Sequence, residues 1–146
     1  MTVREATQDD AFDVLMLAHQ FGKEAPAGFK FSKDKVESFF DRVLADPTMV
    51  WFVSEDEDGI GGFIVGHFPD HPFNDILTAI ELGWFVTKDK RRGTSAMRLV
   101  QAFESWAKEK GADWTALSDI TGIQDLSQLY IRRGYQLAER SFMKEV

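Results

Sequence analysis

The sequence contains no cysteine in its 146 residues. Disulfides, thiolate metal ligands and a cysteine nucleophile are therefore excluded, and any thiol chemistry must come from a ligand. No apolar run approaches the roughly 20 residues that cross a bilayer, and the N-terminus MTVREATQDD lacks the basic-then-apolar order of a signal peptide. These absences predict a soluble, cytoplasmic protein that has no membrane partner.

Positive charge is also scarce, because 17 Lys and Arg stand against 24 Asp and Glu, for a formal net charge of −7. Surfaces that bind nucleic acids are normally basic, so this balance argues against a nucleic-acid partner and favours a cationic one. Apolar residues are plentiful at 44%, with 13 phenylalanines, which is enough to build a core. At this length we expect a single domain over residues 1–146.

Apolar periodicity and turn signals divide the chain into alternating elements. Strands are expected at 3–6, 49–53, 60–68, 76–86 and 114–117, with a final strand or hairpin over 135–146. Helices are expected at about 8–22, 33–45, 95–110 and 124–133. This order predicts a mixed α/β fold in which one mixed, mostly antiparallel sheet is flanked by about four helices.

The first helix should begin at Thr7, with Asp10 in the capping-box position. Phe12, Leu15, Met16 and His19 lie on a stripe with helical spacing, which predicts the buried face of a half-buried helix. On such a stripe, His19 is better interpreted as a histidine at the edge of the core than as a ligand.

Two further regions have alternative interpretations. Phe29 and Phe31 lie in a loop rich in Gly and Pro, where they either fill the core or wall a substrate cleft. The acidic hairpin tip at 55–58 is either a solvated turn or a patch that attracts a cationic substrate. His67 and His71 fall in different local structures, so no metal site is predicted; His67 is kept as a candidate for substrate binding at a cleft mouth.

The stretch from Ile76 to Lys110 reads as a strand, a basic turn and the start of an amphipathic helix. Backbone amides at such a helix N-terminus can bind a phosphate, and the alternative is a solvated basic turn. Five basic residues surround it in an otherwise acidic chain: Lys88, Lys90, Arg91, Arg92 and Arg98.

The sequence Lys90-Arg91-Arg92-Gly93-Thr94-Ser95 resembles the acetyl-CoA pyrophosphate loop of the GNAT N-acetyltransferases, Arg/Gln-x-x-Gly-x-Gly/Ala. Leu129-Tyr130-Ile131-Arg132-Arg133-Gly134-Tyr135 resembles the family's helix ending in Leu-Tyr, polar positions and Gly-Phe/Tyr. The order of elements agrees from the first strand onward. The chain departs from the family at Lys90 and Ser95, and at Ile123, where an Asn is frequent.

The resemblance implies a set of residues that hold the pantetheine and pyrophosphate of acetyl-CoA: Phe85, Val86, Lys90, Arg91, Arg92, Gly93, Thr94, Ser95 and Ala96. It also implies that Tyr130 protonates the departing CoA thiolate, which a phenol can do readily. Packing on the face of Leu126 and Leu129 is the alternative role for Tyr130.

A general base is also needed to remove a proton from the incoming ammonium. Glu81 interrupts an apolar strand, and burial there would raise its pKa towards a useful value. Simple alternation places Glu81 on one face with Ala79, Gly83 and Phe85. His67 and Asp119 are the next candidates.

We therefore expect direct transfer of an acetyl group from acetyl-CoA to a primary amine of a small molecule or protein. Two other functions remain open: a binding or regulatory protein of the same fold that acts through a protein partner, and an unrelated α/β protein that binds another phosphorylated ligand. The sequence leaves the acceptor and a homodimer open.

Overall fold

A computed structural model describes residues 1–26, 30–120 and 125–146. Its strands are β1 (Thr2–Glu5), β2 (Met49–Asp56), β3 (Gly59–His67), β4 (Thr78–Val86) and β5 (Trp114–Ala116). Its helices are α1 (Ala11–Glu24), α2 (Lys33–Ala45), α3 (Ser95–Glu109) and α4 (Ser127–Arg132), with short 3₁₀ turns η1 (Gln8–Asp10) and η2 (Lys88–Lys90). No helix in these three ranges is long and apolar enough to span a membrane.

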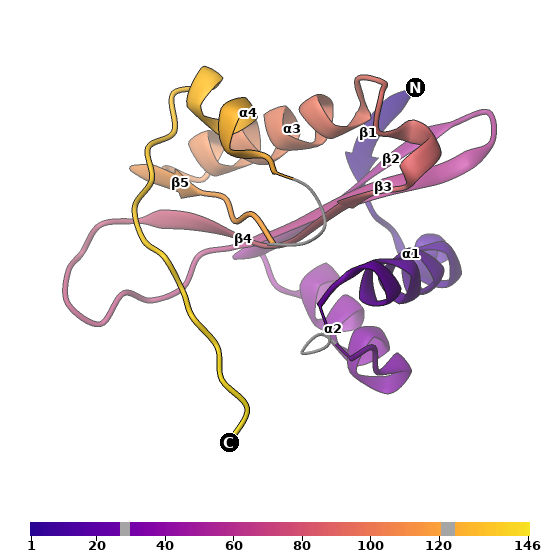
Figure 1. Cartoon of the computed structure of the whole chain (residues 1–146), viewed down its shortest axis with the longest axis horizontal. Coiled ribbons are helices and arrows are strands. Elements are labelled where there is room, and N and C mark those ends of the chain that lie inside the picture. The colour runs from indigo at the N-terminus through magenta and orange to yellow at the C-terminus, as the bar shows by residue number, and fades with distance from the viewer. Residues whose placement is uncertain (27–29, 121–124) are drawn as a thin grey trace.

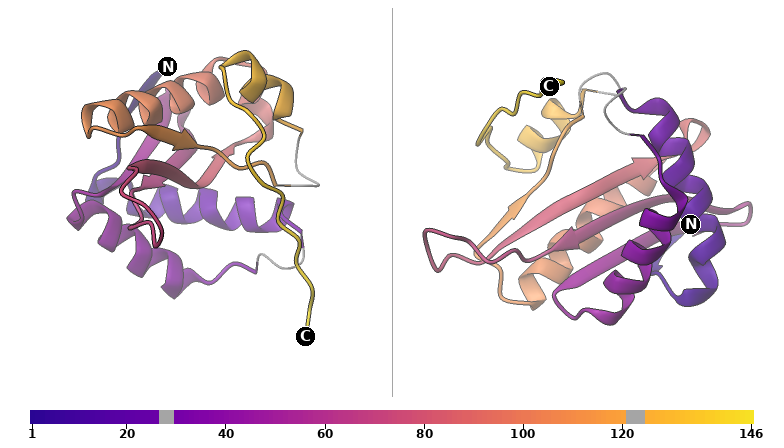
Figure 2. Two further views of the ribbon diagram at one scale, coloured as in Figure 1. Left: turned by 90° about the vertical axis from the view of Figure 1, so that its left-hand side faces the viewer. Right: turned by 90° about the horizontal axis from the view of Figure 1, so that it is seen from below.

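The strands form one sheet in the order β1-β2-β3-β4-β5. β1 to β4 are antiparallel to their neighbours, whereas β5 runs parallel to β4 after the crossover through α3. Helices α1 and α2 cover one face of the sheet, and α3 and α4 cover the other (Figures 1 and 2). The predicted mixed, mostly antiparallel sheet with four flanking helices is confirmed.

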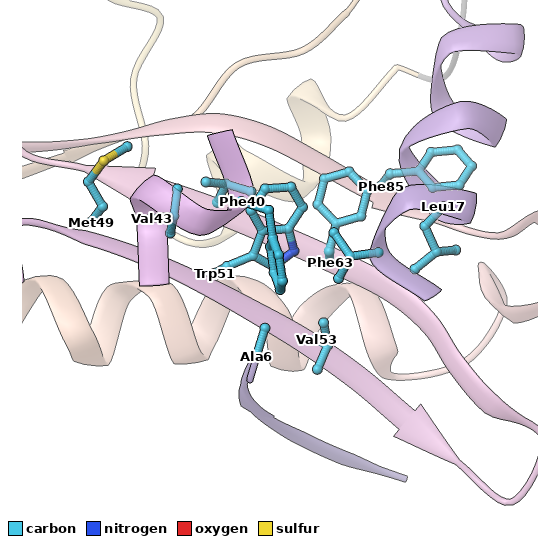
Figure 3. Packing of buried hydrophobic residues seen from close by; sticks show 11 residues of the cluster. Ala6, Leu17, Phe40, Val43, Met49, Trp51, Val53, Phe63 and Phe85 are labelled. Atoms are coloured by element: carbon cyan, nitrogen blue, oxygen red, sulfur yellow. The ribbon is translucent and has the colours of Figure 1, made fainter. Parts of the chain in front are cut away.

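An aromatic core fills the space between the sheet and helices α1 and α2 (Figure 3). Trp51 of β2 packs edge-on against Phe40 of α2 and lies 5.2 Å, centre to centre, from Phe63 of β3. Phe85 of β4 continues this row towards α1. Large rings from neighbouring strands therefore fasten the α1/α2 layer to the sheet.

A second core lies under α3. Phe103, Leu99 and Val100 are fully buried there, against sheet residues that include Ile64. Gly66 of β3 lies beneath Phe103, and a Cβ atom on Gly66 would come within 2.4 Å of the ring. The absence of a side chain at Gly66 thus lets α3 approach the sheet closely.

The predicted buried face of α1 is wrong. Phe12 and Met16 expose 70% and 50% of their surface, whereas Val14, Leu17 and Ala18 are buried. Both sets have helical spacing, because the sequence carries two overlapping apolar stripes. Packing on the sheet selects the second stripe.

The predicted final strand is also absent, since no residue from 135 to 146 is in a strand. Helix α4 ends at Arg132, within one residue of the predicted end, and Gly134 follows it in the left-handed region at φ 91°. The segment that follows crosses the edge of the sheet instead of pairing with it (Figure 1).

Asp10 ties β1 to the start of α1. Its carboxylate accepts hydrogen bonds from the Thr7 backbone N–H at 2.7 Å and from Arg4 at 2.8 and 2.9 Å. The hydrogen bonds from Arg4 lower the pKa of Asp10 from 3.8 to about 2, against the effect of burial. This stabilisation is therefore complete above pH 4 and is lost as the pH falls through 2.

Asp10→Asn should lower the free energy of unfolding at pH 7 by roughly 2 kcal/mol, because it removes a charge-assisted bond to Arg4. Urea unfolding of both proteins at several pH values measures this. The difference should shrink between pH 4 and pH 2. A difference that does not change with pH would contradict an ionic role for Asp10.

Candidate active site

The central feature of the site is a separation of two parallel strands. β4 and β5 pair only at Thr78–Trp114, Ala79–Thr115 and Ile80–Ala116. Beyond these pairs β5 ends, while β4 continues to Val86. In the described part of the chain, this length of β4 has strand neighbours on the β3 side only. A cleft of about 460 Å³ lies along it.

A β-bulge interrupts the alternation of side chains in the part of β4 that borders the cleft. Val65 of β3 pairs with Gly83, but the next residue, Gly66, pairs with Glu81, so Leu82 is the extra residue. Alternation is therefore broken at Leu82. The predicted shared face is wrong: Ala79 packs in the core under α3, and Phe85 packs in the core under α1 and α2.

One end of the cleft is formed by the turn that precedes α3. Five of the nine predicted cofactor residues line it: Phe85, Val86, Arg91, Gly93 and Ala96. The other four, Lys90, Arg92, Thr94 and Ser95, belong to the same turn or to the first turn of α3 but do not line the cleft.

The N-terminus of α3 has unsatisfied donors. No side chain caps it, and the first hydrogen bond of the helix runs from the Arg98 N–H to the Thr94 carbonyl at 3.0 Å. The amides of Ser95, Ala96 and Met97 therefore lack helical acceptors. Ala96 and Met97 line the cleft, so this end of it suits an anion.

The basic residues of the turn are partly neutralised. The Lys90 ammonium pairs with Asp56 at 2.5 Å, which raises the pKa of Lys90, and its side chain lies over Gly61 of the β2–β3 hairpin. Lys90 thus faces the hairpin rather than the cleft. Gly61 leaves room for it, because a Cβ atom there would come 2.4 Å from the Lys90 side chain.

Arg91 joins the turn to two other elements. Its Nε donates to the Val86 carbonyl at 2.8 Å, and its Nη2 donates to Glu24, the last residue of α1, at 2.5 Å. The guanidinium also lies 5.3 Å from the centre of the Phe85 ring. Arg91 therefore fixes this end of the cleft to β4 and α1.

Glu81 lies at the other end of the cleft. It is 7% exposed, and its Oε2 accepts a hydrogen bond from the Ser118 backbone N–H at 3.0 Å. Burial raises the pKa of Glu81 from 4.5 to about 7, although the hydrogen bonds from Ser118 oppose the shift. A carboxyl group with this pKa can exchange a proton near neutral pH.

Tyr130 is buried and does not line the cleft. Its hydroxyl donates to the Ser118 carbonyl at 2.5 Å, and its ring packs on Trp84 and Tyr135. Burial raises the pKa of Tyr130 well above its usual value, and the charges of Glu81 and Asp119 add to the shift. The phenol therefore keeps its proton.

No sequence pattern marks Ser118, yet its backbone binds both candidate catalytic residues. Its N–H binds Glu81 and its carbonyl binds Tyr130. Both contacts are made by backbone atoms, so the type of residue at this position gives no signal of them. Trp84 was missed as well, because its place in the cleft depends on the bulge.

Of the three residues predicted to bind substrate, the structure describes Phe31 and His67. Phe31 packs on His19, with ring centres 4.8 Å apart. His67 lies at the end of β3, where burial lowers its pKa. Neither residue lines the cleft. Phe29 and Ile123 lie outside the described residues.

Searches with the sequence found no matching family model and no matching curated protein. Solved structures, in contrast, match over nearly the whole chain. AAC(6')-Iy, in complex with the bisubstrate analogue CoA-S-monomethyl-acetylneamine, has a TM-score of 0.80 at 16% identity over 99% of this chain and 97% of that one. Glucosamine-6-phosphate N-acetyltransferase from Arabidopsis thaliana has a TM-score of 0.78 at 13% identity, over 99% of this chain and 97% of that one.

A transcriptional regulator from Bacillus halodurans also matches, with a TM-score of 0.80 at 18% identity over 99% of both chains. These likenesses show that the chain has the GNAT fold. The reading as an unrelated α/β fold is therefore excluded.

Proposed function

We propose that this chain, which has the GNAT fold, is a single-domain, acetyl-CoA-dependent N-acetyltransferase that acetylates a primary amine directly. One observation carries the proposal: a single cleft joins the uncapped N-terminus of α3 to the buried carboxyl group of Glu81. The first feature suits a diphosphate, and the second suits proton removal from an ammonium group.

The diphosphate of acetyl-CoA would lie at Gly93, beside Thr94, and at the amides of Ser95, Ala96 and Met97. The pantetheine arm would follow β4 at Phe85 and Val86. Arg91 lines the cleft, and Arg92 is exposed beside it, so both can contribute positive charge. Lys90 would act indirectly, because its pairing with Asp56 holds the turn against the hairpin.

In the transfer step, the amine nitrogen attacks the acetyl carbonyl carbon, and the C–S bond breaks as the N–C bond forms. Glu81 accepts the proton lost by the amine, directly or through water. Tyr130 is the proposed acid for the thiolate. Because its pKa is raised, it would stabilise the sulfur mainly by donating a hydrogen bond, in exchange for the Ser118 carbonyl.

The acceptor end of the cleft favours a cationic amine. Its charged residues, among those described, are the carboxylates of Glu81, Asp119 and Asp125, whereas Arg91 lies at the cofactor end. This arrangement agrees with the net charge of −7. Phe29, Phe31 and His67 remain candidates for acceptor contacts around the cleft mouth.

A second function is a binding or regulatory protein that holds CoA without turnover. The pairing of Lys90 with Asp56 and of Arg91 with Glu24 favours it, because both cations are already compensated within the protein. The likeness to a transcriptional regulator is consistent with it.

Release of the CoA thiol distinguishes the two functions. The protein has no cysteine, so a thiol reagent such as DTNB gives no background from the chain. With acetyl-CoA and an aliphatic diamine, an amino sugar or a lysine peptide, we expect amine-dependent thiol release with at least one class. Binding of acetyl-CoA without release over the whole panel would favour the regulatory function.

A further inference from the structure

Glu24 holds a carboxylate in an unfavourable position. It is the last residue of α1, where the helix dipole places partial negative charge and where basic side chains are the stabilising ones. Its side chain is only 14% exposed, so water and salt screen little of its charge. Among the described residues, its carboxylate accepts a single hydrogen bond, from Arg91 at 2.5 Å. One cation therefore compensates this carboxylate.

Arg91 is held beside the cleft by its other contacts. Its Nε donates to the Val86 carbonyl, and the guanidinium lies against the Phe85 ring. Of the five N–H donors of the guanidinium, the hydrogen bonds found within the described ranges use two, one on Nε and one on Nη2. Arg91 thus has donors left for a phosphate oxygen while it keeps its bond to Val86.

Glu24 neutralises the cation that is best placed to meet an anionic ligand. Arg91 is the only basic residue among the described residues that line the cleft. Lys90 of the same turn pairs with Asp56 on the hairpin, and Arg92 is exposed. A diphosphate that enters the cleft therefore meets a positive charge that Glu24 already shares.

We propose that Glu24 is an internal competitor of acetyl-CoA. Its carboxylate holds Arg91 in the free protein, and the diphosphate of the cofactor takes Arg91 over on binding. This inference rests on the proposed diphosphate site at the turn before α3. One guanidinium between two anions leaves the anions repelling each other, so the diphosphate displaces Glu24. Because this exchange opposes binding, Glu24 lowers the affinity of the protein for acetyl-CoA.

The exchange also affects the wall of the cleft. Phe21 lies one turn before Glu24 in α1, lines the cleft and packs on Phe85 of β4, with ring centres 5.6 Å apart. Loss of the pairing with Arg91 removes the ionic contact between the end of α1 and the turn before α3. Cofactor binding is thereby coupled to the part of α1 that borders the cleft.

Calorimetric titration of Glu24→Gln with acetyl-CoA tests the competition. The amide keeps the size of the side chain but removes its negative charge. The affinity for acetyl-CoA should therefore rise at least about fivefold over that of the wild type, which is the lower end of typical couplings between two sites. The affinity for S-acetylpantetheine, which has no diphosphate, should not change. Raising the salt concentration should reduce the gain for acetyl-CoA.

Asp13→Asn is the matched control, because Asp13 is an exposed acid of α1 and its substitution changes the net charge by the same amount. Its affinity for acetyl-CoA should stay within about twofold of the wild type, since salt screens an exposed charge. If Glu24→Gln bound acetyl-CoA no more tightly than Asp13→Asn, the competition would be wrong. Absence of acetyl-CoA binding to the wild type would refute the proposed cofactor site and, with it, this inference.

A spin label measures the release of α1. The chain has no cysteine, so Lys23→Cys, at an exposed position next to Glu24, provides a single attachment site. Saturation with acetyl-CoA should make the label more mobile. The same label on Glu24→Gln should already be mobile before acetyl-CoA is added. Unchanged mobility in a protein that binds acetyl-CoA would contradict the exchange.

Discussion

Glu81→Gln should reduce the rate of amine acetylation by about 10²–10⁴-fold, the usual contribution of a positioned general base. The rate of the wild-type enzyme should rise with pH around 7, because the buried carboxyl group must be ionised to accept the proton. The variant should lose this rise. Its fold should survive, since the amide oxygen can still accept from the Ser118 N–H.

Stability should change in the opposite direction from activity. The pKa of Glu81 is raised from 4.5 to about 7 on folding, so its ionisation destabilises the native state as the pH rises through this range. Wild-type stability should thus fall by roughly 3 kcal/mol from this group alone, and Glu81→Gln should remove that fall. Urea unfolding at pH 5 and pH 8 measures the difference.

Asp119→Asn is the matched control for this experiment. Asp119 also lines the cleft, but it is exposed and accepts from the Leu126 N–H, which an asparagine can still satisfy. The pH-dependent rise should persist in this variant. If it disappeared in Asp119→Asn and persisted in Glu81→Gln, Asp119 would be the base and the assignment of Glu81 would be wrong.

Gly93→Asp should weaken acetyl-CoA binding by at least about 100-fold. One added negative charge about 5 Å from a diphosphate charge costs on the order of 3 kcal/mol at the effective dielectric constant of a protein surface. The fold should tolerate the change, because a Cβ atom at Gly93 would meet only the Lys90 carbonyl, at 3.4 Å. Stabilisation of the protein by acetyl-CoA in a thermal shift assay measures the loss.

Gly93→Asn separates charge from bulk, since it has nearly the same shape as aspartate. Gly93→Asn should bind acetyl-CoA more tightly than Gly93→Asp. Raising the salt concentration should reduce this difference in affinity, because salt screens the added charge. Equal losses in both variants at low salt would indicate a steric effect. Full binding by Gly93→Asp would mean that the diphosphate does not lie at this turn.

The sequence predicted the parts of the site that depend on local chemistry. Glu81 interrupts an apolar strand, and the structure places it buried in a cleft, with a pKa raised by burial. The strand, basic turn and amphipathic helix predicted over Ile76 to Lys110 are present as β4, η2 and α3, and no side chain caps the N-terminus of α3. Helix α4 ends at Arg132, within one residue of the predicted end, and Gly134 follows it with a positive φ. Such features follow from residue type and short spacing.

Other features depend on distant contacts, which no local pattern shows. The bulge at Leu82 places Phe85 on the opposite face of β4 from Ala79. It arises in the pairing of β4 with β3, which the sequence of β4 alone does not show. The pairing of Lys90 with Asp56 joins residues that are far apart in the sequence. Packing on the sheet decides between the two apolar stripes of α1, and residues 135–146 have the pattern of a strand but form none in the described structure.

Calorimetric titration of the wild-type protein with acetyl-CoA tests the central claim most directly. The claim is that the turn before α3 and the adjoining length of β4 form a site for the CoA diphosphate and pantetheine. It predicts saturable binding with one acetyl-CoA per chain, and CoA itself should compete. Absence of binding at concentrations that saturate other acetyl-CoA sites would contradict it.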